Sequence, residues 1–294
     1  MTRRRAKADF PLVISASRMC DLPQWYPQYL IHEIKQRLET GRTLHSLVIW
    51  TKHPLALLKS PLYDELSYLK SIGIQLYFQI TITGMGNRVC GYDKFQRPWR
   101  PEPIAPSKEE SVKILPQLIS LTEHPLRIRL RIDPILQVKD IKGEFYSNYE
   151  ECKDTIEKCS ALGIRKFSFS FVEPGIYRKV DRRFQQLGIT LIKFDEILRN
   201  KIRYVFSDLE KKLGVDISGC CIEDWPVSSC INGRMLQQLH PQKLDVSLCQ
   251  PHSRPLCGCT ASIDIGGWPP KTCPTGCDYC YARPFYRDLK EKEK

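Results

Sequence analysis

The stretch RIRLRID (127–133) alternates charged and apolar side chains without interruption. A period of two places consecutive side chains on opposite faces of a β-strand, so this strand has one apolar and one strongly polar face. The same alternation occurs in LVISASR (12–18), YFQITIT (77–83) and KFSFSFVE (166–173), and LVIWTK (47–52) is predicted to be a further strand. Together these stretches predict a sheet with one dry face and one polar face.

Helical patterns separate the predicted strands, over residues 24–40, 55–72, 109–123 and 149–162. Strands that alternate with helices form parallel sheets. Buried parallel strands are normally apolar on both faces, and these strands are not. A sheet that curves into a barrel removes the conflict, because its outer face packs on helices while its inner face can be polar. We therefore predict an α/β fold, a partial or permuted (β/α) barrel. An antiparallel sheet with one wet face is the alternative.

The inner face of such a barrel should hold a polar ligand and water. Its predicted members are Gln79, Thr81, Thr83, Arg127, Arg129, Arg131, Asp133, Ser168 and Ser170. Barrel enzymes place their chemistry at the carboxyl ends of the strands. The predicted catalytic residues are Arg18, Lys52, Arg131 and Asp133. The predicted cofactor contacts are Ser15, Ser17, Gln79, Thr81, Thr83 and Ser170. Each alone would be an ordinary ion-pair or capping residue, so the prediction depends on their shared position.

Near the end of the sequence, CPTGCDYCYA (273–282) carries three cysteines at positions i, i+4 and i+7. This spacing would also fit one stripe of a helix, but Pro274 and Gly276 favour a tight loop. Three thiolates on one loop can bind a [4Fe–4S] cluster and leave one iron open to another ligand. A closed structural zinc site would need four protein ligands. Three unrelated buried thiols are the remaining interpretation.

The pattern C-x3-C-x2-C, with Tyr279 before the last cysteine, resembles the cluster motif of radical S-adenosylmethionine enzymes. The resemblance implies that Cys273, Cys277 and Cys280 bind a [4Fe–4S] cluster. It further implies that S-adenosylmethionine binds the open iron and is cleaved reductively to a 5′-deoxyadenosyl radical, which acts on an unknown substrate. Those enzymes carry the motif near the N-terminus, after the first barrel strand. Here ASIDIGG (261–267) precedes it, so we expect a permuted barrel whose last strand lies beside the first.

A second group of cysteines precedes the loop: Cys220, Cys221, Cys230, Cys249, Cys257 and Cys259. Such a group fits a second iron–sulfur cluster or a zinc site with four cysteine ligands, with scattered free thiols as the alternative. The four ligands that we predict are Cys221, Cys230, Cys257 and Cys259. The chain accordingly divides into the main part of the barrel (1–214) and a cysteine-rich region with the last strand and the cluster loop (215–294).

Over most of its length the sequence resembles a bacterial family of unassigned function, usually regarded as radical S-adenosylmethionine-like, with strand motifs similar to those of spore photoproduct lyase. The motifs that carry this resemblance lie at 14–23, 50–54, 78–84, 131–135, 170–172 and 257–282. Members tend to retain the cysteines that match our four predicted ligands. The pair Met19-Cys20 departs from the more usual Arg-Thr, which removes no cluster ligand.

The 45 basic residues exceed the 33 acidic ones, giving a net charge of +12. Such an excess favours a polyanionic partner such as nucleic acid. A radical enzyme would also need an electron donor of the flavodoxin or ferredoxin type. We expect a cytoplasmic protein with no membrane segment, because 13 cysteines without a secretion signal favour metal ligation over disulfides. The alternative is a non-catalytic iron–sulfur or zinc protein that binds nucleic acid or senses redox state.

Overall fold

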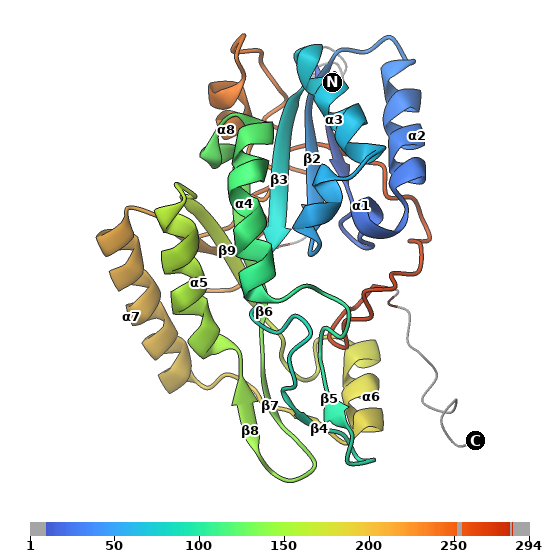
Figure 1. Ribbon diagram of the computed structural model, residues 1–294. Coiled ribbons are helices and arrows are strands. Elements are labelled where there is room, and N and C mark those ends of the chain that lie inside the picture. Colours follow the sequence, from blue (N-terminus) through green and yellow to red (C-terminus); the bar gives the residue numbers. More distant parts are fainter. Residues whose placement is uncertain (1–9, 252–254, 283, 285–294) are drawn as a thin grey trace, which may run out of the picture.

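The alternating stretches form neighbouring strands of one seven-stranded parallel sheet in a computed structural model, which describes residues 10–251, 255–282 and 284 (Figure 1). The strands are β1 (Leu12–Ala16), β2 (Leu44–Thr51), β3 (Gln75–Thr81), β6 (Ile128–Ile135), β9 (Lys166–Phe171), β11 (Asp216–Gly219) and β12 (Ile263–Asp264). Their order is β11-β9-β6-β3-β2-β1-β12. The predicted α/β class with a parallel sheet is therefore confirmed.

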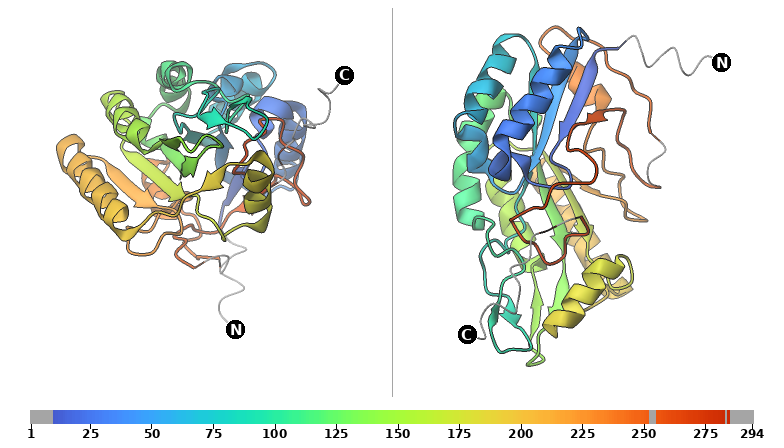
Figure 2. Two further views of the ribbon diagram at one scale, coloured as in Figure 1. Left: turned by 90° about the horizontal axis from the view of Figure 1, so that it is seen from below. Right: turned by 90° about the vertical axis from the view of Figure 1, so that its right-hand side faces the viewer.

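Helices follow most strands of the sheet. They are α1 (Leu22–Trp25), α2 (Pro27–Leu38), α3 (Leu62–Ser71), α4 (Lys108–Thr122), α5 (Tyr149–Ala161), α6 (Arg178–Leu187), α7 (Glu196–Leu213) and α8 (Gly233–Leu239). The long helices α2, α3, α4, α5 and α7 cover one face of the sheet (Figure 2). The predicted dry face, with Ile80, Ile128 and Phe167, is buried in the core that these helices share.

The last strand, β12, pairs in parallel with the first, β1, through Ile14 opposite Ile263 and Ser15 opposite Asp264. This pairing confirms the expected neighbourhood of the last and first strands. At the other edge lies β11, and no pairing between β11 and β12 closes the sheet within the described residues. What the structure shows is thus an open parallel sheet, not a complete barrel.

The polar face of the sheet is covered by the chain's own C-terminal segment. Gln79 Nε2 donates to the carbonyl oxygen of Cys230 at 2.6 Å, and Gln75 Nε2 donates to that of Leu236 at 3.2 Å. Val48 and Tyr77 pack with Met235 and other apolar residues of α8 and its flanks. The prediction of an interior open to ligand and water is therefore wrong over this part of the face. Backbone carbonyls take the hydrogen bonds that a ligand was expected to take.

Beyond the carboxyl ends of the strands lies a small lobe (Figure 1). It contains the pair β4 (Gly91–Tyr92) and β5 (Pro98–Trp99), and the antiparallel strands β7 (Gln137–Lys139), β8 (Phe145–Ser147) and β10 (Thr190–Leu191), with α6 beside them. A second apolar cluster joins Trp99 and Phe184 of this lobe to Cys277 and Tyr279. The cysteine loop therefore packs between the strand ends and the lobe. No helix in the described part of the chain is long and apolar enough to cross a membrane.

The contact of His45 on β2 with Leu244 of the C-terminal segment predicts that the stability of the protein depends on pH. His45 is buried, with Nε2 3.0 Å from the carbonyl oxygen of Leu244 and its ring 4.3 Å from that of His240. Burial lowers the pKa of His45 to about 4. The unfolded chain therefore binds a proton below its ordinary pKa of about 6.5 while the folded chain does not, so stability is lost as the pH falls.

We expect this group to lower the free energy of unfolding by about 2 kcal/mol between about pH 7 and pH 5. Urea unfolding at both pH values measures the change. His45→Gln should reduce the measured pH dependence by about that amount, whereas His32→Gln, on the exposed face of α2, should leave it intact. An unchanged pH dependence in His45→Gln would contradict the assignment.

Candidate functional site

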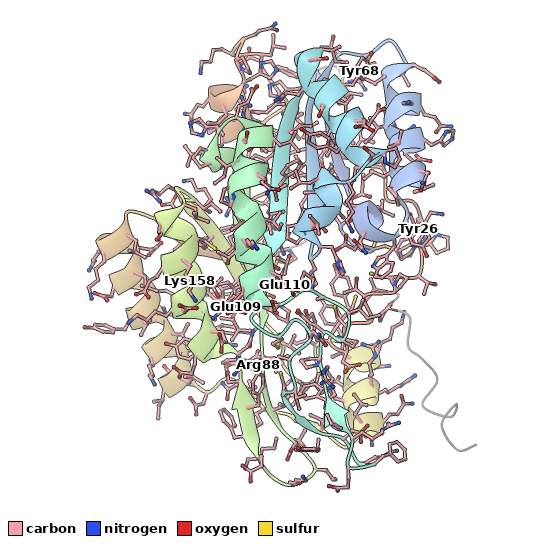
Figure 3. The ribbon with its side chains drawn as sticks, in the orientation of Figure 1. Tyr26, Tyr68, Arg88, Glu109, Glu110 and Lys158 are labelled. Atoms are coloured by element: carbon pink, nitrogen blue, oxygen red, sulfur yellow. The ribbon has the colours of Figure 1, made fainter. Side chains whose placement is uncertain are left out.

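The cysteine loop lies at the carboxyl ends of β1 and β2, where residues that follow these strands bind it. Trp25 Nε1 donates to Thr275 Oγ1 at 2.9 Å, and His53 Nε2 lies 3.0 Å from the same hydroxyl. Tyr26, beside the loop in Figure 3, donates from its hydroxyl to the carbonyl oxygen of Thr272 at 2.8 Å. Thr275 is buried, so these contacts fix the middle of the loop against the sheet.

Asp21 connects the two strand ends with the first cysteine of the loop. Its carboxylate accepts from Thr51 Oγ1 at 2.8 Å and from the backbone N–H of Lys52 at 2.7 Å. Its own backbone N–H donates to Cys273 Sγ at 3.5 Å. Asp21 therefore positions Cys273 against the ends of β1 and β2.

The three loop thiols differ in environment. A hydrogen bond from the Cys20 thiol lowers the pKa of Cys273 to about 6, whereas burial raises the pKa of Cys277 and of Cys280. The Lys52 ammonium opposes the shift at Cys277. Cys20 is thus a fourth thiol at this loop. In the described ranges no three His, Cys, Asp or Glu side chains are arranged to coordinate one ion.

Glu102 is a buried acidic group beside the loop. Its side chain, 3 % exposed, accepts at Oε1 from Lys52 Nζ at 2.9 Å, from Thr83 Oγ1 at 2.8 Å and from the Tyr279 hydroxyl. Burial opposes the charge of Lys52, but Glu102 and Cys277 more than offset it and raise the pKa of Lys52. Two predicted residues, Lys52 and Thr83, therefore meet at this carboxylate. Sequence reasoning missed Glu102, because a glutamate between Pro101 and Pro103 carries no periodic signal.

Other predicted residues meet at the second cysteine group. Arg131 Nη1 donates to Cys230 Sγ at 2.7 Å, while Arg131 and Ser170 both donate to the carboxylate of Asp133. Hydrogen bonds with Cys220 and Cys259, together with Arg131, hold the pKa of Cys230 well below its usual range. Arg131 and Asp133 thus lie at Cys230.

The four predicted ligands of the second group are only partly brought together. Cys230 contacts Cys259, and Cys257 lies close enough to raise the pKa of the Cys259 thiol. Cys220 also contacts Cys230, whereas the sequence favoured Cys221. Cys221 has a left-handed backbone, with φ of 55°, so the chain turns between these two residues. Because Cys220 and Cys221 are adjacent in sequence, the sequence alone could not show which of them lies beside Cys230.

The remaining predicted residues have structural partners. Ser15 Oγ donates to Asp264 Oδ2 at 3.1 Å, and Arg18 Nε forms an ion pair with the same carboxylate at 3.3 Å, so both bind β12 to the sheet. Ser17 Oγ donates to the carbonyl oxygen of Cys20 at 2.7 Å and forms the turn after β1. Thr81 lies opposite Arg131 in the sheet register.

A surface hollow lies apart from the cysteine loop, beside the start of α4. Arg88 and Glu109, labelled in Figure 3, line it together with Lys108 and Glu151. Arg88 and Lys108 both form ion pairs with Glu151. Because its charges neutralise one another and it contains no predicted site residue, the hollow does not compete with the loop as the candidate site.

Fold and site define an α/β protein with a parallel sheet and a cysteine loop at its strand ends. The chain belongs to the family described as "Domain of unknown function (DUF1848)", which matches residues 13–282. No curated protein matches it significantly.

Similar solved structures are distant. SuiB of Streptococcus suis bound to the precursor peptide SuiA has a TM-score of 0.39 and 11% identity, covering 73% of this chain and 50% of SuiB. SuiB bound to S-adenosylmethionine has a TM-score of 0.36 and 11% identity, covering 71% and 47%. The aldose reductase of Schistosoma japonicum has a TM-score of 0.30 and 12% identity, covering 81% and 90%. This chain thus spans about half the length of SuiB, and the site has to be interpreted from its own residues.

The buried ion pair makes a prediction about stability. Glu102→Ala leaves the Lys52 ammonium buried without its carboxylate, so we expect a loss of about 3 kcal/mol in the free energy of unfolding. Urea unfolding measures the loss, and Glu223→Ala, at an exposed carboxylate, should change stability by less than about 0.5 kcal/mol. Lys52→Met combined with Glu102→Ala should recover a large part of the loss. A double variant as unstable as Glu102→Ala alone would show that the unpaired charge is not the cause.

Proposed function

We propose that this protein is a radical S-adenosylmethionine-type enzyme in which Cys273, Cys277 and Cys280 bind a [4Fe–4S] cluster. The observation that carries the proposal is the place of the cysteine loop. It follows β12, which pairs with β1, and it is bound at the carboxyl ends of β1 and β2. In radical S-adenosylmethionine enzymes the cluster loop follows the first barrel strand. Here the loop follows the last strand, but that strand lies beside β1, so the proposed cluster would occupy the corresponding place at the strand ends. The open sheet is then one part of a permuted (β/α) barrel.

The side chains and backbone groups around the loop are chemically suited to a [4Fe–4S] cluster. Cluster ligands must be thiolates, and thiolates form beside cations and backbone N–H donors. Lys52 provides the cation near Cys277, and the Asp21 N–H reaches Cys273. Cys273 and Cys277 are buried in apolar surroundings, which would limit access of water and oxygen. Coordination requires the three thiols to turn toward a common point.

The surrounding residues have separable tasks in this proposal. When bound, the cluster and S-adenosylmethionine would supply radical chemistry by one-electron cleavage of the sulfonium bond. Trp25 and His53 fix the loop through Thr275, and Asp21 orients Cys273. Lys52 and Glu102 provide a fixed pair of opposite charges beside the loop. An external one-electron donor, of the flavodoxin or ferredoxin type, would complete the system.

The proposal is tested anaerobically on the reconstituted chain. We expect about four irons and four sulfides at this loop, a reduced-cluster paramagnetic spectrum that shifts when S-adenosylmethionine is added, and formation of 5′-deoxyadenosine. Cys277→Ala should abolish the shift and the product. Cys249→Ser, at an exposed cysteine that is not among the ligands proposed for either metal site, should keep them.

A cluster that is indifferent to S-adenosylmethionine would overturn the proposal and favour a binding or redox-sensing protein whose metal is fully ligated by the chain. Zinc in place of iron at Cys273, Cys277 and Cys280 would have the same consequence. Both outcomes are read from metal analysis and the spectrum, before any substrate is known.

We further propose that the second cysteine group binds its own metal, an iron–sulfur cluster or zinc, through Cys220, Cys230, Cys257 and Cys259. The support is the contact of Cys230 with both Cys220 and Cys259. Cys220→Ser should therefore lower the metal content beyond that of the loop, measured by mass spectrometry of the purified chain. Cys221→Ser is the matched control and should not. The reverse result would restore Cys221 as the ligand.

A further inference from the structure

One side of helix α6 forms a basic surface beside the cysteine loop. Arg178, Lys179 and Arg182 are exposed and lie within an arc of about 100° on the helix. The opposite side of α6, with Val180 and Phe184, is buried in the cluster that contains Cys277 and Tyr279. The helix therefore presents its cations outward while it packs on the loop.

Within the described residues, no ion pair neutralises the three exposed cations of this surface. The one acid of the helix, Asp181, accepts the backbone N–H of Gly175 at 3.2 Å. A basic helix face is usually a solvated face, so a ligand has to be argued from a second observation.

That second observation is a stacked pair of exposed tyrosines at the start of α6. Tyr177 and Tyr281 have ring centroids 4.9 Å apart and planes inclined by 16°, and they are 44% and 42% exposed. Tyr281 directly follows the last loop cysteine, and Arg183 Nη1 donates to the carbonyl oxygen of Cys280 at 3.1 Å. The tyrosine pair therefore connects the basic surface with the loop.

A similar combination occurs at the other end of the helix. Phe95 is 50% exposed and has Lys94 5.1 Å and Arg97 4.5 Å from its ring centroid. The backbone N–H of Lys94 donates to the carbonyl oxygen of Leu187, the last residue of α6. Exposed rings therefore lie at both ends of a helix about 15 Å long that carries three exposed cations. We call Tyr177, Arg178, Lys179, Arg182, Tyr281 and Lys94–Phe95 the α6 surface.

We propose that the α6 surface binds single-stranded nucleic acid. Cations in a row bind the phosphates, and exposed aromatic rings stack with unpaired bases, which is how single strands are bound without sequence preference. A duplex hides its bases from these rings. An acidic protein, such as an electron carrier, would use the charges but not the rings. The proposal depends on the α6 surface alone and not on the proposed radical chemistry, so the two fail independently.

The test is fluorescence anisotropy of a labelled oligothymidine with the full chain. We expect binding that weakens steeply between about 50 mM and 200 mM salt, and weaker binding to a duplex. Arg178→Gln, Lys179→Gln and Arg182→Gln together should weaken binding at least about tenfold. The slope of log affinity against log salt should become less negative by about 2, because three phosphate contacts are lost. Tyr177→Ala should weaken it about tenfold.

The matched control removes three exposed lysines from the helices on the outer face, by Lys153→Gln, Lys201→Gln and Lys211→Gln, with the same loss of charge. An equal loss of affinity in this control would overturn the proposal, because net charge alone would explain the binding. The proposal would also be overturned if the chain bound duplex as tightly as single strands and Tyr177→Ala had no effect. Binding of an acidic electron carrier but not of the oligonucleotide would assign the surface to that protein. Thermal unfolding shows whether the variants keep their fold.

Discussion

The buried contact between Lys52 and Glu102 is the interaction on which the arrangement of the candidate site depends. A charge removed from water costs several kcal/mol unless a partner offsets it. Lys52 follows β2, Thr83 follows β3 and Tyr279 belongs to the cysteine loop, and all three donate to the same carboxylate. The loop cannot leave the strand ends without losing one of these donors. Its position is thus a consequence of pairing a buried charge.

The sheet could be predicted from sequence because its strands alternate with period two. Ile80, Ile128 and Phe167 are buried against the helices, as the alternation predicts. The short β12 was predicted from the strand pattern of ASIDIGG (261–267), which directly precedes the cysteine loop, although only two of its residues pair. The site was predictable where residues follow a strand, as Lys52 and Thr83 do. Glu102, between two prolines, and Cys220, beside another cysteine, offered no such signal.

The polar face of the sheet shows why a residue pattern does not identify its partner. Gln79 was predicted to face a ligand, but its side chain donates to a backbone carbonyl of the C-terminal segment, as does that of Gln75. A buried amide needs a hydrogen-bond partner of either kind, because leaving it unpaired costs about 1–3 kcal/mol. The residue pattern places these amides on one face of the sheet but does not specify their partners. Which group satisfies them depends on a segment more than 150 residues further along the chain.

Backbone pairing at the edge of the sheet explains how a cysteine motif late in the chain reaches the ends of the first strands. In a parallel sheet, a strand adds to an edge through its backbone, so its place in the chain matters less than its register. Ser15 of β1 and Arg18, two residues after its end, both bind Asp264 of β12, which fixes that register at the edge. The residues after β12 must then emerge at the carboxyl ends of the sheet, next to those after β1. A loop that follows the last strand therefore reaches the same end of the sheet as one that follows the first.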